Sequence, residues 1–137
     1  MSWTPAGPSV NLSGHLGRAG KAVCRRPLPP DGFWTQTFVA SRLLEYEVFN
    51  RIHARASAAS HADTARQLLD RVNLLELTGA VLGRALQPYP QPARTLDGLH
   101  LTTMDFLRGQ GLDLALATYD QRLAAVAIAM GFALADC

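Results

Sequence analysis

The 137-residue sequence is poor in cysteine and lacks long apolar runs. Its two cysteines, Cys24 and Cys137, have no metal-ligand spacing, and we expect free thiols in a reducing compartment rather than a disulfide. The longest apolar run, 123–134, contains Gly131 and is too short to cross a bilayer. No signal peptide is recognisable. These absences predict a cytoplasmic protein that does not contact a membrane.

Acidic residues are absent from residues 1–30, which carry four basic residues and a charge of +4. Because the whole chain has a net charge of +2, residues 31–137 sum to −2, which argues against a strongly basic nucleic-acid binder. Prolines and glycines are dense in residues 1–32, with no period of 2 or 3.6 residues. We therefore predict a disordered or atypical Pro/Gly-rich segment over 1–32 and one domain over 33–137.

From residue 33 onward, short apolar runs alternate with amphipathic segments. The predicted strands are 37–40, 73–77, 114–117 and 132–134. The predicted helices are 42–58, 60–71, 78–86, 95–109 and 120–130, with Ser41, Ser60, Thr78, Thr95 and Asp120 as N-terminal caps. Strands that alternate with helices imply a parallel sheet covered on both faces, and ligands of such sheets bind at the carboxyl ends of the strands.

Three carboxylates are candidates for a site at that edge. Asp97 lies in the first turn of a predicted helix, and Asp120 follows a predicted strand. On the upstream helix, Glu47 shares a face with apolar residues whereas Glu45 points about 200° away. Carboxylates that converge bind a hard divalent cation. The alternative is structural, because an acid near a helix N-terminus is stabilised by ~0.3–1 kcal/mol. His100 is expected to be a hydrogen-bonded core residue rather than a ligand.

Three motifs together resemble the PIN-domain family, and in particular the VapC-type toxins of type II toxin–antitoxin systems. The motifs are Ser-x-Leu-x-x-x-Glu-Val from Ser41, Arg-Thr-Leu-Asp-x-Leu-His-Leu from Arg94, and Thr-Tyr-Asp-x-Arg-Leu from Thr118. The resemblance covers residues 33–134. It implies a three-layer α/β/α sandwich with a parallel sheet, a cognate antitoxin and an RNA substrate. Whether the protein forms a homodimer stays open.

The resemblance also implies a site. A Mg²⁺- or Mn²⁺-dependent endoribonuclease of this kind would use Glu47, Asp97 and Asp120 as metal-binding and catalytic residues. Thr118 matches a hydroxyl beside the last acid and is expected, with Arg94, to contact the substrate. For Arg94, simple solvation of the helix entry is the alternative.

The N-terminus departs from the family, which opens with a strand that ends in aspartate, as in Leu-Asp-Thr. This chain has Trp3-Thr4-Pro5 and then the Pro/Gly-rich segment, so we expect the first strand to be missing or altered and activity to be impaired. A reading-frame change would explain the departure, since one set of codons for Leu-Asp-Thr, CTG-GAC-ACC, gives Trp-Thr-Pro when it is read one base later. A natural divergent start explains it as well.

Three hypotheses follow from these observations. The first is a PIN-type ribonuclease toxin, active or impaired. The second is a catalytically inactive PIN-like module that still binds an antitoxin. The third is an unrelated α/β domain whose acids are helix caps, and clustering of Glu47, Asp97 and Asp120 in space would separate it from the other two.

Overall fold

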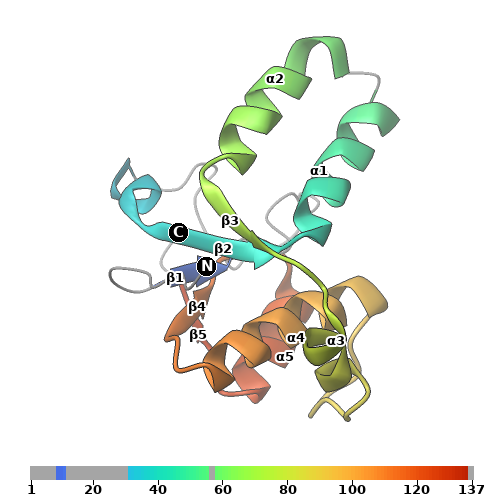
Figure 1. The fold of residues 1–137 in the computed structure, drawn as a ribbon, viewed down its shortest axis with the longest axis vertical. Helices are drawn as coiled ribbons and strands as arrows, with labels where there is room; N and C mark the ends of the chain where they lie inside the picture. The colour runs from blue at the N-terminus through green and yellow to red at the C-terminus, as the bar shows by residue number, and fades with distance from the viewer. Residues whose placement is uncertain (1–8, 12–30, 56–57, 136–137) are drawn as a thin grey trace.

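The computed structural model describes residues 9–11, 31–55 and 58–135, which form a mixed α/β fold (Figure 1). The strands are β1 (Ser9–Asn11), β2 (Thr37–Ser41), β3 (Val72–Leu75), β4 (Leu114–Leu116) and β5 (Ala133–Leu134). The helices are α1 (Leu43–Ala54), α2 (Ala58–Leu69), α3 (Gly79–Ala85), α4 (Thr95–Gly109) and α5 (Gln121–Ala129), with a turn of 3-10 helix, η1 (Asp31–Thr35). The predicted α/β class is confirmed.

These strands form one parallel sheet in the order β3-β2-β1-β4-β5. Parallel neighbours need crossover connections, which α1 and α2 supply between β2 and β3, and α5 supplies between β4 and β5. Figure 1 shows α1 and α2 on one side of the strands and α3, α4 and α5 on the other. The carboxyl ends of β2 and β4 open at the same sheet edge, where α1 and α5 begin.

The expectation that residues 1–32 contribute no strand is wrong for Ser9–Asn11. These residues form the central strand, in which Val10 lies opposite Phe38 of β2 and Ala115 of β4. Pairing on both sides satisfies the backbone hydrogen bonds of even a short strand. A segment of three residues among prolines and glycines shows no period, so the sequence pattern did not reveal it. The predictions for 1–8 and 12–30, including Cys24, and for Cys137 lie outside the described residues.

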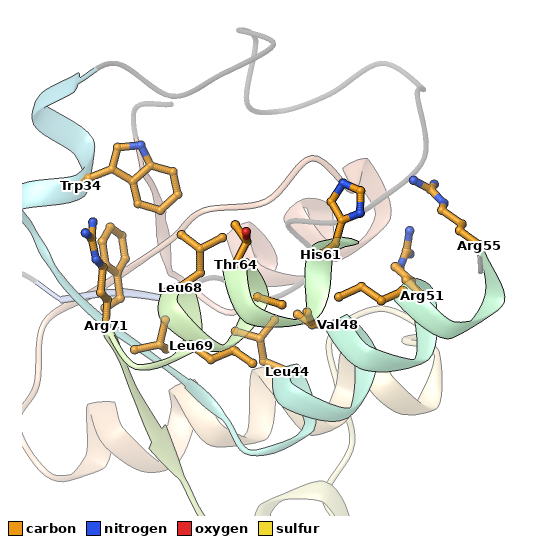
Figure 2. A pocket seen from close by; sticks show the side chains of 14 residues that line it. Trp34, Leu44, Val48, Arg51, Arg55, His61, Thr64, Leu68, Leu69 and Arg71 are labelled. Carbon is orange, nitrogen blue, oxygen red and sulfur yellow. The ribbon is translucent and has the colours of Figure 1, made fainter. Parts of the chain in front are cut away.

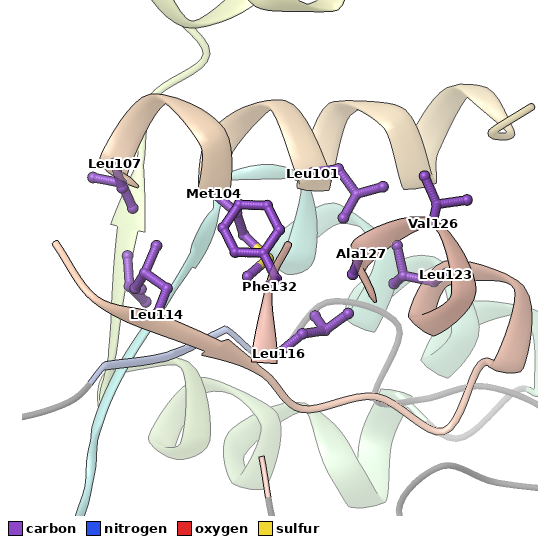
Figure 3. Close-up of a cluster of buried hydrophobic side chains, with 10 residues drawn as sticks. Leu101, Met104, Leu107, Leu114, Leu116, Leu123, Val126, Ala127 and Phe132 are labelled. Carbon is purple, nitrogen blue, oxygen red and sulfur yellow. The ribbon is translucent and has the colours of Figure 1, made fainter. Parts of the chain in front are cut away.

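Strand β2 contributes alternate residues to two hydrophobic clusters. Val39 packs with residues of α4, β4 and α5, whereas Phe38 and Ala40 pack with Leu44 of α1. Figure 3 shows the first cluster, which contains Val39, Leu101, Met104, Leu107, Leu114, Leu116, Leu123, Val126, Ala127 and Phe132. Full burial of a leucine or phenylalanine side chain stabilises a fold by ~1.5–3 kcal/mol. This cluster therefore fixes α4 and α5 against one face of the sheet.

The helix starts agree in part with the sequence. Thr78 caps α3 by accepting the N–H of Val81, and Asp120 caps α5 by accepting the N–H groups of Arg122 and Leu123. Thr95 is not the cap but the first residue of α4, because the carbonyl of Arg94 already accepts the N–H of Gly98 and Arg94 holds the cap position. Ser60 is not a cap either, since it lies inside α2.

In the part of the chain that the structure describes, every helix is too short or too polar to cross a membrane.

Candidate metal centre

Each predicted acidic residue lies beside the carboxyl edge of the sheet. Glu47 is in the second turn of α1, which follows β2. Asp97 is in the first turn of α4, and Asp120 precedes α5 in the connection from β4. The predicted difference between the two acids of α1 is confirmed. The Glu47 side chain is 22% exposed and turns inward, whereas Glu45 is 49% exposed and pairs with Arg42.

Glu47 is held by a buried histidine. His100 Nε2 lies 2.9 Å from Glu47 Oε2, and His100 Nδ1 lies 3.1 Å from Ser41 Oγ. Because a carboxylate only accepts hydrogen bonds, Nε2 carries a hydrogen and donates it to Glu47. Ser41 Oγ also accepts the N–H of Leu43 at 3.2 Å. Ser41 and His100 are both fully buried, so the end of β2 and helix α4 together fix the Glu47 carboxylate.

Asp97 and Asp120 share one arginine. Arg94 Nε donates to Asp97 Oδ2 at 3.1 Å, and Arg94 Nη2 donates to Asp120 Oδ2 at 2.6 Å. The Asp97 and Asp120 side chains are 15% and 24% exposed, and Arg94 is 59% exposed. The guanidinium thus covers two carboxylates that come from sequence positions 23 residues apart.

The Asp120 carboxylate is also fixed by the helix that it caps. Its Oδ1 accepts the backbone N–H groups of Arg122 at 2.9 Å and Leu123 at 3.3 Å. Thr118 is buried, and its hydroxyl accepts the N–H of Asp120 at 3.0 Å. This contact orients the backbone of Asp120 and gives the Thr118 hydroxyl a local structural partner, so its predicted role in substrate binding stays a prediction.

The pKa values in the site depend on two carboxylates that share one arginine. Burial of Asp97 raises the pKa of its carboxyl above the ordinary value, and the charge of Asp120 raises it further. Hydrogen bonding and attraction from Arg94, with a smaller attraction from His100, oppose this shift without cancelling it. Reciprocally, Asp97 and then Asp120 raise the pKa of Arg94. Asp97 is therefore linked electrostatically both to Asp120 and to the histidine that holds Glu47.

The chemical nature of the donors suits Mg²⁺ or Mn²⁺, which prefer carboxylate oxygens. Their arrangement does not yet form a metal site. Over residues 9–11, 31–55 and 58–135, no group of three or more His, Cys, Asp or Glu side chains is placed to hold a metal ion. Arg94 and His100 instead pair with the three acids.

From the sequence alone, His100 is expected in the core and Ser41 is expected only as a helix cap. The structure adds that both residues belong to the hydrogen-bonded path to Glu47. The signal in the sequence was weak: His100 lies three residues after Asp97, hence on nearly the same helical face.

A second feature lies between α1 and α2, which enclose an apolar pocket of about 460 Å³ (Figure 2). Its apolar lining includes Leu44, Val48, Ile52, Ala65, Leu68 and Leu69. Three exposed arginines, Arg51, Arg55 and Arg71, also line it, and none of the described residues that line it is acidic. The pocket therefore combines an apolar floor with positive charge.

The fold and the site together define a class of protein. It is a parallel α/β domain with ion-paired acidic residues beside the carboxyl ends of its strands. Over 86 aligned residues, the chain is 34% identical to Ribonuclease VapC47 of Mycobacterium tuberculosis (strain CDC 1551 / Oshkosh). The alignment covers 63% of this chain and 62% of that protein, so the chain spans about three fifths of the length of this curated relative. No family model and no solved structure match the chain. The similarity supports a relationship to VapC-type toxins.

Proposed function

We propose that this chain is a VapC-type toxin with a PIN-like three-layer α/β/α sandwich. It is an endoribonuclease that uses Mg²⁺ or Mn²⁺, with Glu47, Asp97 and Asp120 as metal-binding and catalytic residues. A divalent cation at such carboxylates stabilises charge that develops on a phosphodiester and lowers the pKa of a bound water. Both the RNA substrate and a cognate antitoxin are expected in the cytoplasm.

The observation that carries this proposal is one path of contacts. It runs from Glu47 to His100, and from Asp97 through Arg94 to Asp120. Asp97 and His100 lie one turn apart on α4, so both halves of the path meet on this helix. Three unrelated helix caps have no reason to be linked in this way, and the path therefore disfavours an acid-capped domain of other function.

Several residues have separate parts in the proposed site. His100 holds the Glu47 carboxylate, and Thr118 fixes the backbone of Asp120. Arg94 is exposed beside the acidic residues, and we expect it to contact an RNA phosphate. Asn11 stands at the carboxyl end of the central strand, where an acid would add negative charge. Its amide is neutral, and we expect weaker metal binding and impaired activity for that reason.

The test is cleavage of single-stranded RNA by the purified chain with Mg²⁺, with Mn²⁺ and with a chelator. Asp97→Asn should lower the cleavage rate by at least about a hundredfold, because it neutralises a predicted metal ligand. Asp63→Asn is the matched control, since Asp63 is an exposed acid of α2. Cleavage that persists in the chelator or in Asp97→Asn would contradict the assignment.

The second candidate is a catalytically inactive module that binds an antitoxin, and the apolar pocket supports its binding role. A partner segment with apolar side chains flanked by acids fits a pocket with an apolar floor and three arginines. In a complex with the antitoxin, Leu68→Glu inside the pocket should abolish association. Leu82→Glu, at another exposed leucine that lies on α3 outside the pocket, should not. Complex formation without any metal-dependent cleavage would favour this candidate over the ribonuclease.

A further inference from the structure

The position of Arg94 carries an inference about how the acidic site is occupied. Asp120 Oδ1 already accepts two backbone N–H groups at the start of α5. Its other oxygen, Oδ2, accepts from Arg94 Nη2 at 2.6 Å. The same guanidinium donates a hydrogen bond from Nε to Asp97 Oδ2. A ligand that binds Oδ2 of both aspartates must therefore displace the guanidinium of Arg94.

The charges around Arg94 leave the site negative. Glu47, Asp97 and Asp120 carry three negative charges when ionised, and Arg94 supplies one positive charge. Arg94 therefore does not neutralise the three carboxylates. A single arginine thus reduces the repulsion between Asp97 and Asp120 without neutralising the site, and the remaining charge attracts a further cation.

The exposure of Arg94 makes it replaceable. Its side chain is 59% exposed, so water and salt screen its charge on the side away from the two aspartates. A divalent cation carries twice the charge in a much smaller volume and prefers carboxylate oxygen. Since Arg94 precedes α4 in extended backbone conformation, its side chain can turn to solvent without disturbing the helix.

We propose that Arg94 is the resident counter-ion of this site and that it competes with divalent cations for Asp97 and Asp120. The proposal rests on the proposed function, in which these aspartates are metal ligands. Arg94 holds the two carboxylates together in the metal-free protein and leaves them when Mg²⁺ or Mn²⁺ binds. Its presence therefore weakens metal binding in the absence of RNA.

The experiment measures Mn²⁺ binding to the full chain without RNA, by the electron paramagnetic resonance signal of free Mn²⁺. Arg94→Gln should bind Mn²⁺ roughly fivefold to tenfold more tightly than the unchanged chain, because one competitor is removed. Arg94→Lys should lie between the two, since it keeps a charge but loses the planar fork that reaches both aspartates. Thermal unfolding followed by circular dichroism checks that each variant is folded.

The matched control is Arg66→Gln, which removes the same charge from an exposed arginine paired with Asp63 on α2. It should leave the Mn²⁺ affinity unchanged. Equal affinities for the unchanged chain, Arg94→Gln and Arg94→Lys would overturn the proposal while leaving the metal site intact. A gain of equal size in Arg66→Gln would overturn it too, because the effect would be general charge. Absence of binding, or binding that survives Asp97→Asn with Asp120→Asn, would overturn the metal assignment and this proposal together.

Discussion

Helix α4 carries an aspartate near each end, and the two have opposite surroundings. Asp97, in the first turn, shares the single guanidinium of Arg94 with a second carboxylate, that of Asp120. Asp105, two turns further on, lies between two guanidinium groups, those of Arg84 and Arg108. One cluster has an excess of negative charge and the other an excess of positive charge, although both are built from the same two residue types.

The surroundings of Asp105 form a structural clamp. Arg108 Nη2 donates to Asp105 Oδ1 at 2.6 Å, and Arg84 Nε donates to Oδ2. Each guanidinium also lies over an aromatic ring, Arg84 over Tyr89 at 5.0 Å and Arg108 over Phe132 at 4.0 Å. Burial alone would raise the pKa of Asp105, but the hydrogen bonds and charges of the two arginines outweigh it and lower that pKa.

The two clusters on α4 differ as a binding site differs from a structural support. At Asp105 the two guanidinium groups supply more positive charge than the carboxylate has negative charge, so the ionised carboxylate is favoured. At Asp97 burial and a neighbouring acid raise the pKa, so the folded protein keeps a group whose charge it does not fully stabilise. Such uncompensated charge is typical of functional sites, where a ligand completes the balance.

The largest expected effect separates the two aspartates by stability. Asp105→Asn should lower the free energy of unfolding by about 2 kcal/mol, because it leaves two partly buried guanidinium groups without their carboxylate. Asp97→Asn should change it by no more than about 0.5 kcal/mol, since the lost ion pair is offset by relief of repulsion with Asp120. Urea unfolding at pH 7 measures both. Equal losses in the two variants would break the comparison.

A smaller effect is expected at the central strand. Asn11→Asp places a charge at the carboxyl end of β1 and should tighten Mn²⁺ binding roughly fivefold to tenfold through added attraction. Ser9→Asp is the matched control, because it places the same charge at the amino end of the same strand. Titration with Mn²⁺ measures both affinities. If Asn11→Asp binds Mn²⁺ no more tightly than Ser9→Asp does, the missing charge at the end of β1 is not what limits the metal affinity of the site.

The smallest expected effect is on the pH dependence of stability. Asp105 has a lowered folded-state pKa, so its contribution is present above about pH 3.9 and is lost as pH falls through that lower pKa. Asp97 has a raised folded-state pKa, so its contribution is present below about pH 3.9 and is lost as pH rises through the higher pKa.

Urea unfolding midpoints between about pH 2.5 and 7 test these opposite signs against the unfolded pKa of roughly 3.9. Asp105→Asn should weaken the dependence of the unfolding midpoint on pH below the unfolded pKa. Asp97→Asn should weaken that dependence above the unfolded pKa. Departures of both variants from the unchanged chain in the same pH range would contradict the assignment of the two shifts.

The sequence predicted those features that depend on local pattern. The periodicity of apolar residues placed α1, α4 and α5, and the helical face separated Glu47 from Glu45. Asp120 was recognised as a cap because the cap and its helix are adjacent in sequence. The prediction was wrong for β1, whose three residues are too few to show a period and are identified only by their partners on both sides.

The long-range contacts of the site could not be predicted. His100 and Glu47 are 53 residues apart, and Arg94 and Asp120 are 26 apart. The local sequence suggests two roles for Arg94, a phosphate contact or a solvated residue, and neither includes its pairing with both aspartates. Pairings of this kind depend on how the elements pack, which the local pattern does not encode.

The central claim is that Glu47, Asp97 and Asp120 bind one divalent cation while the Asp105 end of α4 does not. The most direct measurement is a Mg²⁺ titration followed by ¹H–¹⁵N chemical shifts of the full chain. The account predicts saturable shifts centred on the amides of Glu47, Asp97 and Asp120, with the amide of Asp105 unmoved. Shifts that are absent, that scatter over the surface acids, or that are as large at Asp105 as at Asp97 would contradict it.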